Sequence, residues 1–148
     1  MELILRPIGR VDNGATEAVD EGWGTVESTL VLDEHYATAL EGLAEFSHLL
    51  VLFWMHEAPQ PTAMRRRPQG RADLPEVDIL AQRARHRPNP IGVTAVELLG
   101  VDGNRVQVRG LDAINGTPLL DLKPYFPQYD ARPARVPEWV NRLMEGYF

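Results

Sequence analysis

Short apolar runs separated by turn residues dominate the chain. Residues 46–56 (FSHLLVLFWMH) are almost continuously apolar, which predicts a central strand buried on both faces. Side chains alternate between the two faces of a strand. Leu50, Leu52 and Trp54 should therefore share one face, with Leu49, Val51 and Phe53 on the other.

Further strands are predicted at residues 3–8, 25–32, 92–101, 105–111 and 119–123. The first contains Pro7 and is expected near a sheet edge, because proline cannot donate a ladder hydrogen bond. Asp102-Gly103 is a dipeptide favoured in tight turns, so it predicts a hairpin between residues 92–101 and 105–111. Twelve glycines and twelve prolines in 148 residues also favour a β-rich fold, and the length fits one domain over residues 1–148.

Two helices are predicted. A short one covers residues 33–43, with Asp33 as its N-cap. The second covers residues 137–147 and carries an apolar stripe suited to packing against the β-domain or a second subunit. Residues 58–75 are too long and too polar for packed structure, so we expect a loop there.

Composition and charge narrow the function. The chain has no cysteine, which excludes disulfides, thiolate zinc sites and a cysteine nucleophile, and fits a reducing compartment. The apolar run at the start is too short for a signal peptide or a membrane span, so we expect a cytoplasmic protein. The net charge is −6, yet residues 65–87 hold seven arginines against three acidic residues, a balance of +4 that leaves −10 elsewhere. This basic stretch is either a site that steers an anionic ligand or a solvated loop.

Three segments carry more specific side chains than a β-domain needs. In residues 83–92, Pro88 and Pro90 remove backbone donors and present Asn89, either to a ligand or as a rigid connector. In residues 115–125, Asp121 and Lys123 share a face, as catalytic groups or as a surface ion pair. His56 and Glu57 follow the central strand, where a lone histidine is more often an ordinary hydrogen-bonding residue than a catalyst.

Several other chemistries have no support in the sequence. The histidines lack zinc-ligand spacing, no calcium loop is present, and we expect no metal. Gly22-Trp-Gly24 does not continue into a dinucleotide-binding fingerprint, and no Gly-x-Ser-x-Gly elbow occurs. The residues alone thus indicate a β-rich domain with a Pro-Asn-Pro ligand loop and a basic flank.

The same segments carry a family resemblance. Residues 46–56 (FSHLLVLFWMH), 87–92 (RPNPIG) and 116–125 (GTPLLDLKPY) resemble the three signature blocks of the TrmO-type (YaeB, TsaA-like) S-adenosylmethionine-dependent tRNA methyltransferases, in the family's order. The resemblance spans roughly residues 8 to 126. It implies a mainly β, antiparallel β-barrel-like domain and a homodimer with S-adenosylmethionine near the subunit interface.

The resemblance also implies site residues. By alignment, cofactor contacts are expected at His56, Glu57, Arg83, Val93, Ile114, Asn115, Gly116 and Thr117. The chemistry of the Pro-Asn-Pro loop adds Arg87, Pro88, Asn89 and Pro90. Asp121, Lys123 and Tyr125 are candidate catalytic residues, with Asp121 as the proton acceptor. Arg65, Arg66 and Arg67 are expected to bind the substrate, the anticodon arm of tRNA.

The activity implied is methylation of N6 of threonylcarbamoyl-adenosine at tRNA position 37. Two alternatives stay open: a methyltransferase of the same fold with a small-molecule acceptor, and a non-catalytic barrel that binds a ligand or RNA. The chain departs from the family at Gln82-Arg83-Ala84-Arg85, where Thr-Arg-Ser is usual, and at Asn115, where aspartate is usual. It also lacks the family's Pro-Arg-Gln element before Gly22 and the C-terminal extension of longer members.

Overall fold

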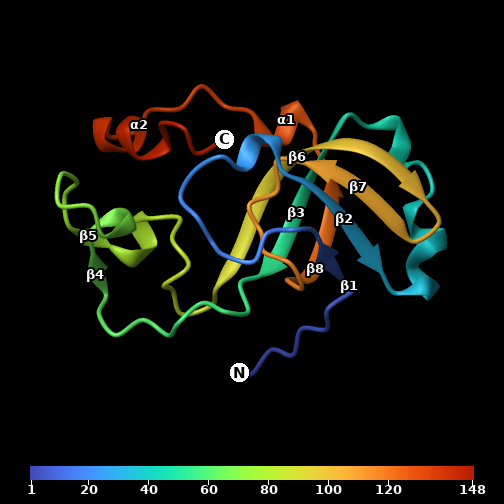
Figure 1. Ribbon diagram of the computed structural model, residues 1–148, viewed down its shortest axis with the longest axis horizontal. Coiled ribbons are helices and arrows are strands. Elements are labelled where there is room, and N and C mark those ends of the chain that lie inside the picture. Colours follow the sequence, from blue (N-terminus) through green and yellow to red (C-terminus); the bar gives the residue numbers. More distant parts are fainter.

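A computed structural model describes residues 1–148 as a closed antiparallel β-barrel with a smaller lobe beside it (Figure 1). Six strands form the barrel in the order β1-β2-β7-β6-β3-β8. Their bounds are β1 Gly9–Asp12, β2 Glu27–Leu32, β3 His48–Trp54, β6 Ile91–Asp102, β7 Arg105–Arg109 and β8 Pro118–Pro124. The mainly β, barrel-like fold class expected from the resemblance is confirmed.

The predicted hairpin is present with a shift of one residue. β6 and β7 pair from Glu97 with Arg109 to Asp102 with Arg105, so Gly103 and Asn104 form the two-residue turn. Gly103 has φ 59°, and the side-chain amide of Asn104 donates to the Leu32 carbonyl (2.6 Å). A positive φ in a two-residue hairpin loop is a position where glycine is favoured.

β3 pairs with β6 on one side and with β8 on the other. Every strand of the closed barrel has two neighbours, so no strand is central in the predicted sense. The prediction that it is buried on both faces is wrong. Leu49, Val51 and Phe53 point into the barrel and are buried, whereas Leu50, Leu52 and Trp54 on the outer face are only half-buried. A barrel has one interior, so its outer face stays uncovered unless another element or another chain lies on it.

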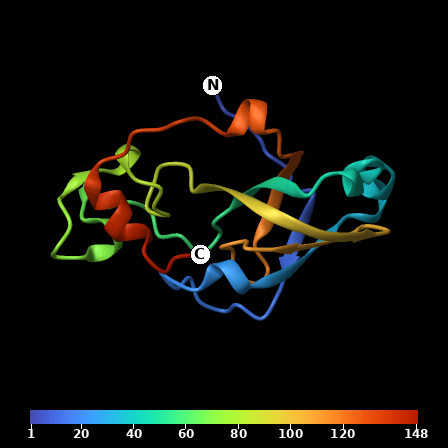
Figure 2. The ribbon, with the colours of Figure 1, turned by 90° about the horizontal axis from the view of Figure 1, so that it is seen from above.

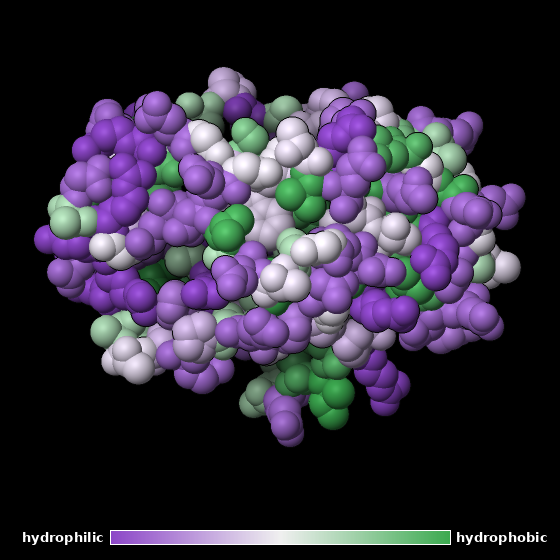
Figure 3. Space-filling model, viewed as in Figure 1, coloured by the Kyte–Doolittle hydropathy of each residue, from purple (hydrophilic) through white to green (hydrophobic).

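The start of the chain differs from the prediction. Residues 3–8 do not form a strand: β1 begins at Gly9, and the first barrel hydrogen bond is from the Ile8 amide to the Leu119 carbonyl (2.8 Å). Pro7 has no amide hydrogen to extend the ladder. The apolar side chains of Leu3, Ile4 and Leu5 are exposed, and Figure 3 shows apolar atoms projecting from the body near the N-terminus.

The short helix after β2 is present but is a 3₁₀-helix, η2 (Glu34–Leu40), followed by η3 (Leu43–Glu45). Asp33 lies at the N-cap without a side-chain capping hydrogen bond. β2 begins two residues later than predicted, because Trp23–Thr25 form another 3₁₀-turn, η1, around the buried Trp23. After β8 a one-turn helix, α1 (Pro127–Asp130), leads into the C-terminal segment.

Residues 57–90, between β3 and β6, form the smaller lobe, which we call the insert (Figures 1 and 2). The prediction that residues 58–75 lack packed structure is wrong. β4 (Arg65–Arg66) pairs with β5 (Val77–Asp78), and η4 (Pro68–Gly70) and η5 (Ile79–Ala81) flank this ribbon. Pro68, Leu74 and Ile79 are buried, and the Gln82 side-chain amide donates to the carbonyls of Arg66 (2.8 Å) and Val77 (3.0 Å).

The C-terminal helix, α2 (Glu138–Met144), is shorter than predicted. Gly146, with φ 73°, turns the chain out of the helix. The hydrogen bonds between α2 and the rest of the chain go to the insert rather than to the barrel, as described below. None of the helices has the length and apolar character needed to cross a bilayer.

Candidate ligand site at one rim of the barrel

The barrel topology brings the three singled-out segments to one rim. Neighbouring strands run in opposite directions, so the end of β3 lies beside the starts of β6 and β8: Trp54 pairs with Ile91, and Phe53 pairs with Leu119. His56-Glu57, the Pro-Asn-Pro segment and the Asn-Gly-Thr turn therefore all meet there. Only one strand separates the two turns, so their backbones are about 10 Å apart at interstrand spacings of about 4.8 Å.

The Asn-Gly-Thr turn is fixed to the end of β1. The amides of Asn115 and Gly116 donate to the carbonyls of Ala15 (2.7 Å) and Val11 (2.8 Å). Gly116 has φ 81°, with open space on the side where a Cβ would project. Thr117 is buried, and its hydroxyl donates to the Ile114 carbonyl (2.7 Å), so it shapes the turn from within. A ligand could approach the backbone at Gly116 closely.

Asn13, which the sequence analysis did not single out, holds this turn in place. Its side-chain nitrogen, Nδ2, donates to the Ser28 hydroxyl and the Ala113 carbonyl (both 2.9 Å). Its side-chain oxygen accepts from the Ala15 amide (3.0 Å), and its backbone amide donates to the side-chain oxygen of Asn115 (3.1 Å). The Asn13 side chain thus links the end of β1 to β2 and to Ala113 ahead of the turn, and its backbone amide contacts the turn itself at Asn115.

The Pro-Asn-Pro segment leaves its polar groups available. The Pro90 carbonyl accepts from the Met55 amide (2.8 Å), which joins the segment to the end of β3. Pro88 and Asn89 are exposed, and the Asn89 side chain makes no hydrogen bond. Arg87 braces the loop by donating to the carbonyls of Gln82 (3.0 Å) and Ala84 (3.1 Å).

Charged groups flank these turns. The Arg83 guanidinium donates to the Val93 carbonyl (2.6 Å), so two expected cofactor-binding residues are in contact. Just after β3, the His56 Nε2 atom lies 3.9 Å from the Glu57 Oε1 atom. Beside the Asn-Gly-Thr turn, residues 15–26 line an open depression of about 310 Å³ that includes Trp23 and Val26.

A second carboxylate, Asp112, lies between β7 and the turn. It accepts hydrogen bonds of 2.5 Å from the Thr94 hydroxyl and from the Tyr147 hydroxyl. Burial, and then the neighbouring Asp112 charge, raise the pKa of Tyr147 above its ordinary value. No motif in the sequence indicates this contact, because Tyr147 is 35 residues away in the chain and belongs to the apolar stripe predicted over residues 137–147.

The candidate catalytic residues do not gather at this rim within one chain. Asp121 and Lys123 form an ion pair (2.8 Å) on the outer side of β8, and hydrogen bonding to Asp121 raises the pKa of Lys123. Tyr125 follows β8 near the opposite rim, where its amide donates to the His48 carbonyl (3.0 Å). At about 3.3 Å per residue, Tyr125 lies roughly 25 Å along the strand from Thr117.

The three arginines expected to bind substrate lie in the insert. Arg65 contacts the carboxylates of Glu76 and Asp78 (3.8 Å each), and Arg67 donates to the Leu74 carbonyl. Arg66 is partly buried, whereas Arg85 is exposed and has no partner. No group of three or more histidine, aspartate or glutamate side chains is arranged to hold a metal ion.

These features define a small antiparallel β-barrel protein with a candidate ligand site between two turns at one rim. Residues 20–131 match the model of the tRNA-methyltransferase O N-terminal domain. The chain therefore belongs to the TrmO family of S-adenosylmethionine-dependent methyltransferases, as the sequence resemblance indicated.

Individual relatives agree with this assignment. A probable S-adenosyl-L-methionine-binding protein of Methanothermobacter thermautotrophicus is 37% identical over 135 residues, covering 88% of this chain and 96% of the relative. The human tRNA (adenine(37)-N6)-methyltransferase is 37% identical over 100 residues, which are 68% of this chain and 22% of the human protein. The crystal structure of TrmO from Pseudomonas aeruginosa superposes with a TM-score of 0.75 at 33% identity. That match covers 91% of this chain, which spans 62% of the solved TrmO chain.

Proposed function

We propose that this protein transfers a methyl group from S-adenosylmethionine to N6 of threonylcarbamoyl-adenosine at position 37 of tRNA. The observation that carries the proposal is the meeting of the Pro-Asn-Pro segment and the Asn-Gly-Thr turn at one rim, in a chain of this family. A tRNA substrate would place the reaction in the cytoplasm. The human relative's name specifies N6 of adenine 37, which supports this choice of acceptor.

The rim offers the groups that S-adenosylmethionine needs. Arg83 can pair with its carboxylate, the unpartnered Asn89 amide suits the adenine edge, and the open space at Gly116 lets the backbone approach the ribose. Glu57 is a carboxylate suited to the positive sulfonium, and Val93 adds apolar contact. The donor cofactor supplies an already activated methyl group.

The protein's main task is then to align the acceptor nitrogen. Holding two reactants close together in the reactive orientation can lower the activation barrier by roughly 7–11 kcal/mol. Asp121 is our candidate acceptor for the proton lost from this nitrogen, with Lys123 and Tyr125 orienting the acceptor. Asp121→Asn should lower kcat by about 10²-fold or more, the usual contribution of a proton acceptor. Full turnover of this variant would remove Asp121 from the mechanism.

We further propose that the protein works as a homodimer. Three observations support this: the distance between Tyr125 and the rim within one chain, the exposed apolar residues 3–5, and an outer apolar face on β3 and β6. This face consists of Leu50, Leu52, Trp54, Ile91 and Val93, and both Ile91 and Val93 are about 40% exposed. A partner covering it would bring a second β8 closer to the rim.

Two experiments test these proposals. Purified protein is incubated with methyl-labelled S-adenosylmethionine and total tRNA, with or without the threonylcarbamoyl modification, and the nucleosides are analysed. Label confined to threonylcarbamoyl-adenosine supports the proposed reaction; label in a small molecule, or binding without transfer, overturns it. For the dimer, light scattering should give a molar mass twice that of one chain. Ile91→Glu should lower the measured mass towards that of a single chain. Val136→Glu, at an exposed apolar position off this face, is the control.

A further inference from the structure

The C-terminal residues 138–148 bind both parts of the molecule. We call this segment the clasp: its helix α2 lies against the insert, and its last three residues lie against the barrel. Figure 2 shows the helix beside the insert and the C-terminus between the insert and the barrel. The clasp is thus a second link between the two parts, besides the chain itself.

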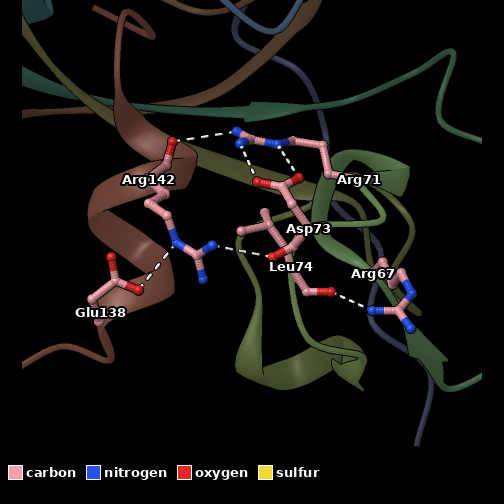
Figure 4. A network of polar contacts seen from close by, with 6 residues as sticks. All are labelled: Arg67, Arg71, Asp73, Leu74, Glu138 and Arg142. Atoms are coloured by element: carbon pink, nitrogen blue, oxygen red, sulfur yellow. Dashed lines mark hydrogen bonds and ion pairs between the residues drawn. The ribbon is translucent and has the colours of Figure 1, made fainter.

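On the insert side the contacts form a polar network (Figure 4). Arg71 holds Asp73 through two hydrogen bonds (3.0 and 2.7 Å) and donates to the Arg142 carbonyl at the end of α2 (3.3 Å). Arg142 in turn donates to the Asp73 carbonyl (3.2 Å) and to the Glu138 carboxylate (3.1 Å). Backbone and side chains of the helix and the insert are therefore joined in both directions.

On the barrel side the tail adds backbone and side-chain bonds. The amides of Gly22 and Trp23 donate to the carbonyls of Gly146 and Tyr147 (2.9 Å each). The Tyr147 hydroxyl donates to Asp112, which also holds Thr94 of β6. Gly24 lies against the Phe148 backbone, so closely that a Cβ at Gly24 would be 2.5 Å from the Phe148 carbonyl carbon.

The position of the insert depends on how many attachments it has. Its two ends leave the barrel side by side, at Met55 and Pro90, and the Arg83 bond to Val93 lies close to the second end. Attachments gathered at one place leave a lobe free to pivot about them. The clasp adds an attachment at Arg71 and Asp73, in the middle of the insert sequence and away from its two ends. It thereby holds the orientation of the arginine-bearing lobe relative to the rim.

We propose that Arg142 and Tyr147 are positioning residues: through the clasp they hold the insert in the orientation that presents its arginines to an RNA bound at the rim. This inference rests on the proposed function for its RNA, but the mechanical link can be measured without it. The clasp touches neither the Pro-Asn-Pro segment nor the Asn-Gly-Thr turn by any hydrogen bond. Arg142, at the insert end of the clasp, should therefore affect use of RNA while leaving affinity for S-adenosylmethionine unchanged.

The test uses Arg142→Ala, which removes the side-chain bond to the Asp73 carbonyl but keeps the backbone bond from Arg71. It also uses Tyr147→Phe, which removes only the bond to Asp112, and the double variant. The control is Arg135→Ala, an exposed arginine outside the clasp with no hydrogen bond or ion pair. Each substitution should raise the KM for tRNA about three- to tenfold, with kcat changed less than twofold. Calorimetry should show an unchanged Kd for S-adenosylmethionine in Arg142→Ala, and hydrogen exchange of residues 65–82 should speed up in both variants but not in the control.

The double variant tests whether Arg142 and Tyr147 act through the same link. The two substitutions weaken opposite ends of one link, which act in series, so the double variant should be little worse than the single ones. Two outcomes would overturn the clasp. One is a double variant whose KM increase equals the product of the two single increases, and the other is hydrogen exchange in the insert that Tyr147→Phe leaves unchanged. If no tRNA is methylated, the proposed function fails while the exchange experiment still tests the clasp. Faster exchange with an unchanged KM would remove the positioning role and leave only a structural one.

Discussion

Gly92, at the second position of β6, lies directly over the ring of Phe53 on β3. A Cβ at Gly92 would be 2.3 Å from the Phe53 Cζ atom, and Phe53 is buried in the barrel core. The two residues are paired in the ladder, so neither backbone can withdraw without breaking it. The missing side chain at residue 92 is therefore what allows the phenyl ring to fill the barrel below the rim.

Gly92→Ala should consequently destabilise the protein. The Phe53 ring must leave its place, and overpacking of this kind costs about 1–3 kcal/mol. Urea denaturation followed by circular dichroism would show a lower midpoint. Gly100→Ala is the matched control, because Gly100 lies on the same strand in open space, without a positive φ. Equal midpoints for the two variants would mean that the ring adjusts freely.

The elements that depend on local sequence could be predicted. The β6–β7 hairpin follows from a glycine turn between two alternating runs, and β3 follows from its apolar residues. The burial of β3 on one face only could not be predicted, because whether Leu50 and Leu52 are covered depends on the sheet closing into a barrel.

Longer-range contacts account for the other differences. Leu74 is buried in the insert because β4 and β5 pair across the ten residues between them, which are mostly polar. Asn13 contacts Asn115, 102 residues away in the chain, and Tyr147 contacts Asp112, 35 residues away. No periodicity or motif in either segment indicates these partners. The turns that present the site could thus be predicted, but not the side chains that hold them.

Asn13→Ala should loosen the Asn-Gly-Thr turn. The substitution removes the bonds to Ser28, Ala113 and Ala15 together and leaves buried partners without replacement, at a cost of about 1–3 kcal/mol. We expect the Kd for S-adenosylmethionine, measured by calorimetry, to rise about tenfold. Asn141→Ala, an exposed asparagine on α2, should leave it unchanged. An unaltered Kd in Asn13→Ala would show that the turn keeps its shape without this brace.

Replacing Arg65, Arg66 and Arg67 together by alanine should weaken tRNA binding and its salt dependence. Each phosphate contact to a single strand contributes a slope of about −0.7 in log K against log salt, so the slope should become shallower by at most about 2. The change in slope should be smaller than this maximum, because Glu76 and Asp78 already offset part of the Arg65 charge. Filter binding at several salt concentrations measures it, with Arg135→Ala as the control. An unchanged slope would exclude these arginines from the RNA interface.

Tyr147 should make the protein less stable at high pH. Burial and the Asp112 charge raise its pKa in the folded state above the ordinary value of about 10, so the unfolded chain loses this proton first. The stability that the protonated phenol contributes is complete below about pH 10 and declines as the pH rises beyond it. Lys123, whose pKa is also raised, gives a decline of the same sign, so the wild type must be compared with Tyr147→Phe. Urea midpoints from pH 8.5 to 11 should fall more steeply for the wild type; parallel curves would mean that the phenol is not held against Asp112 in solution.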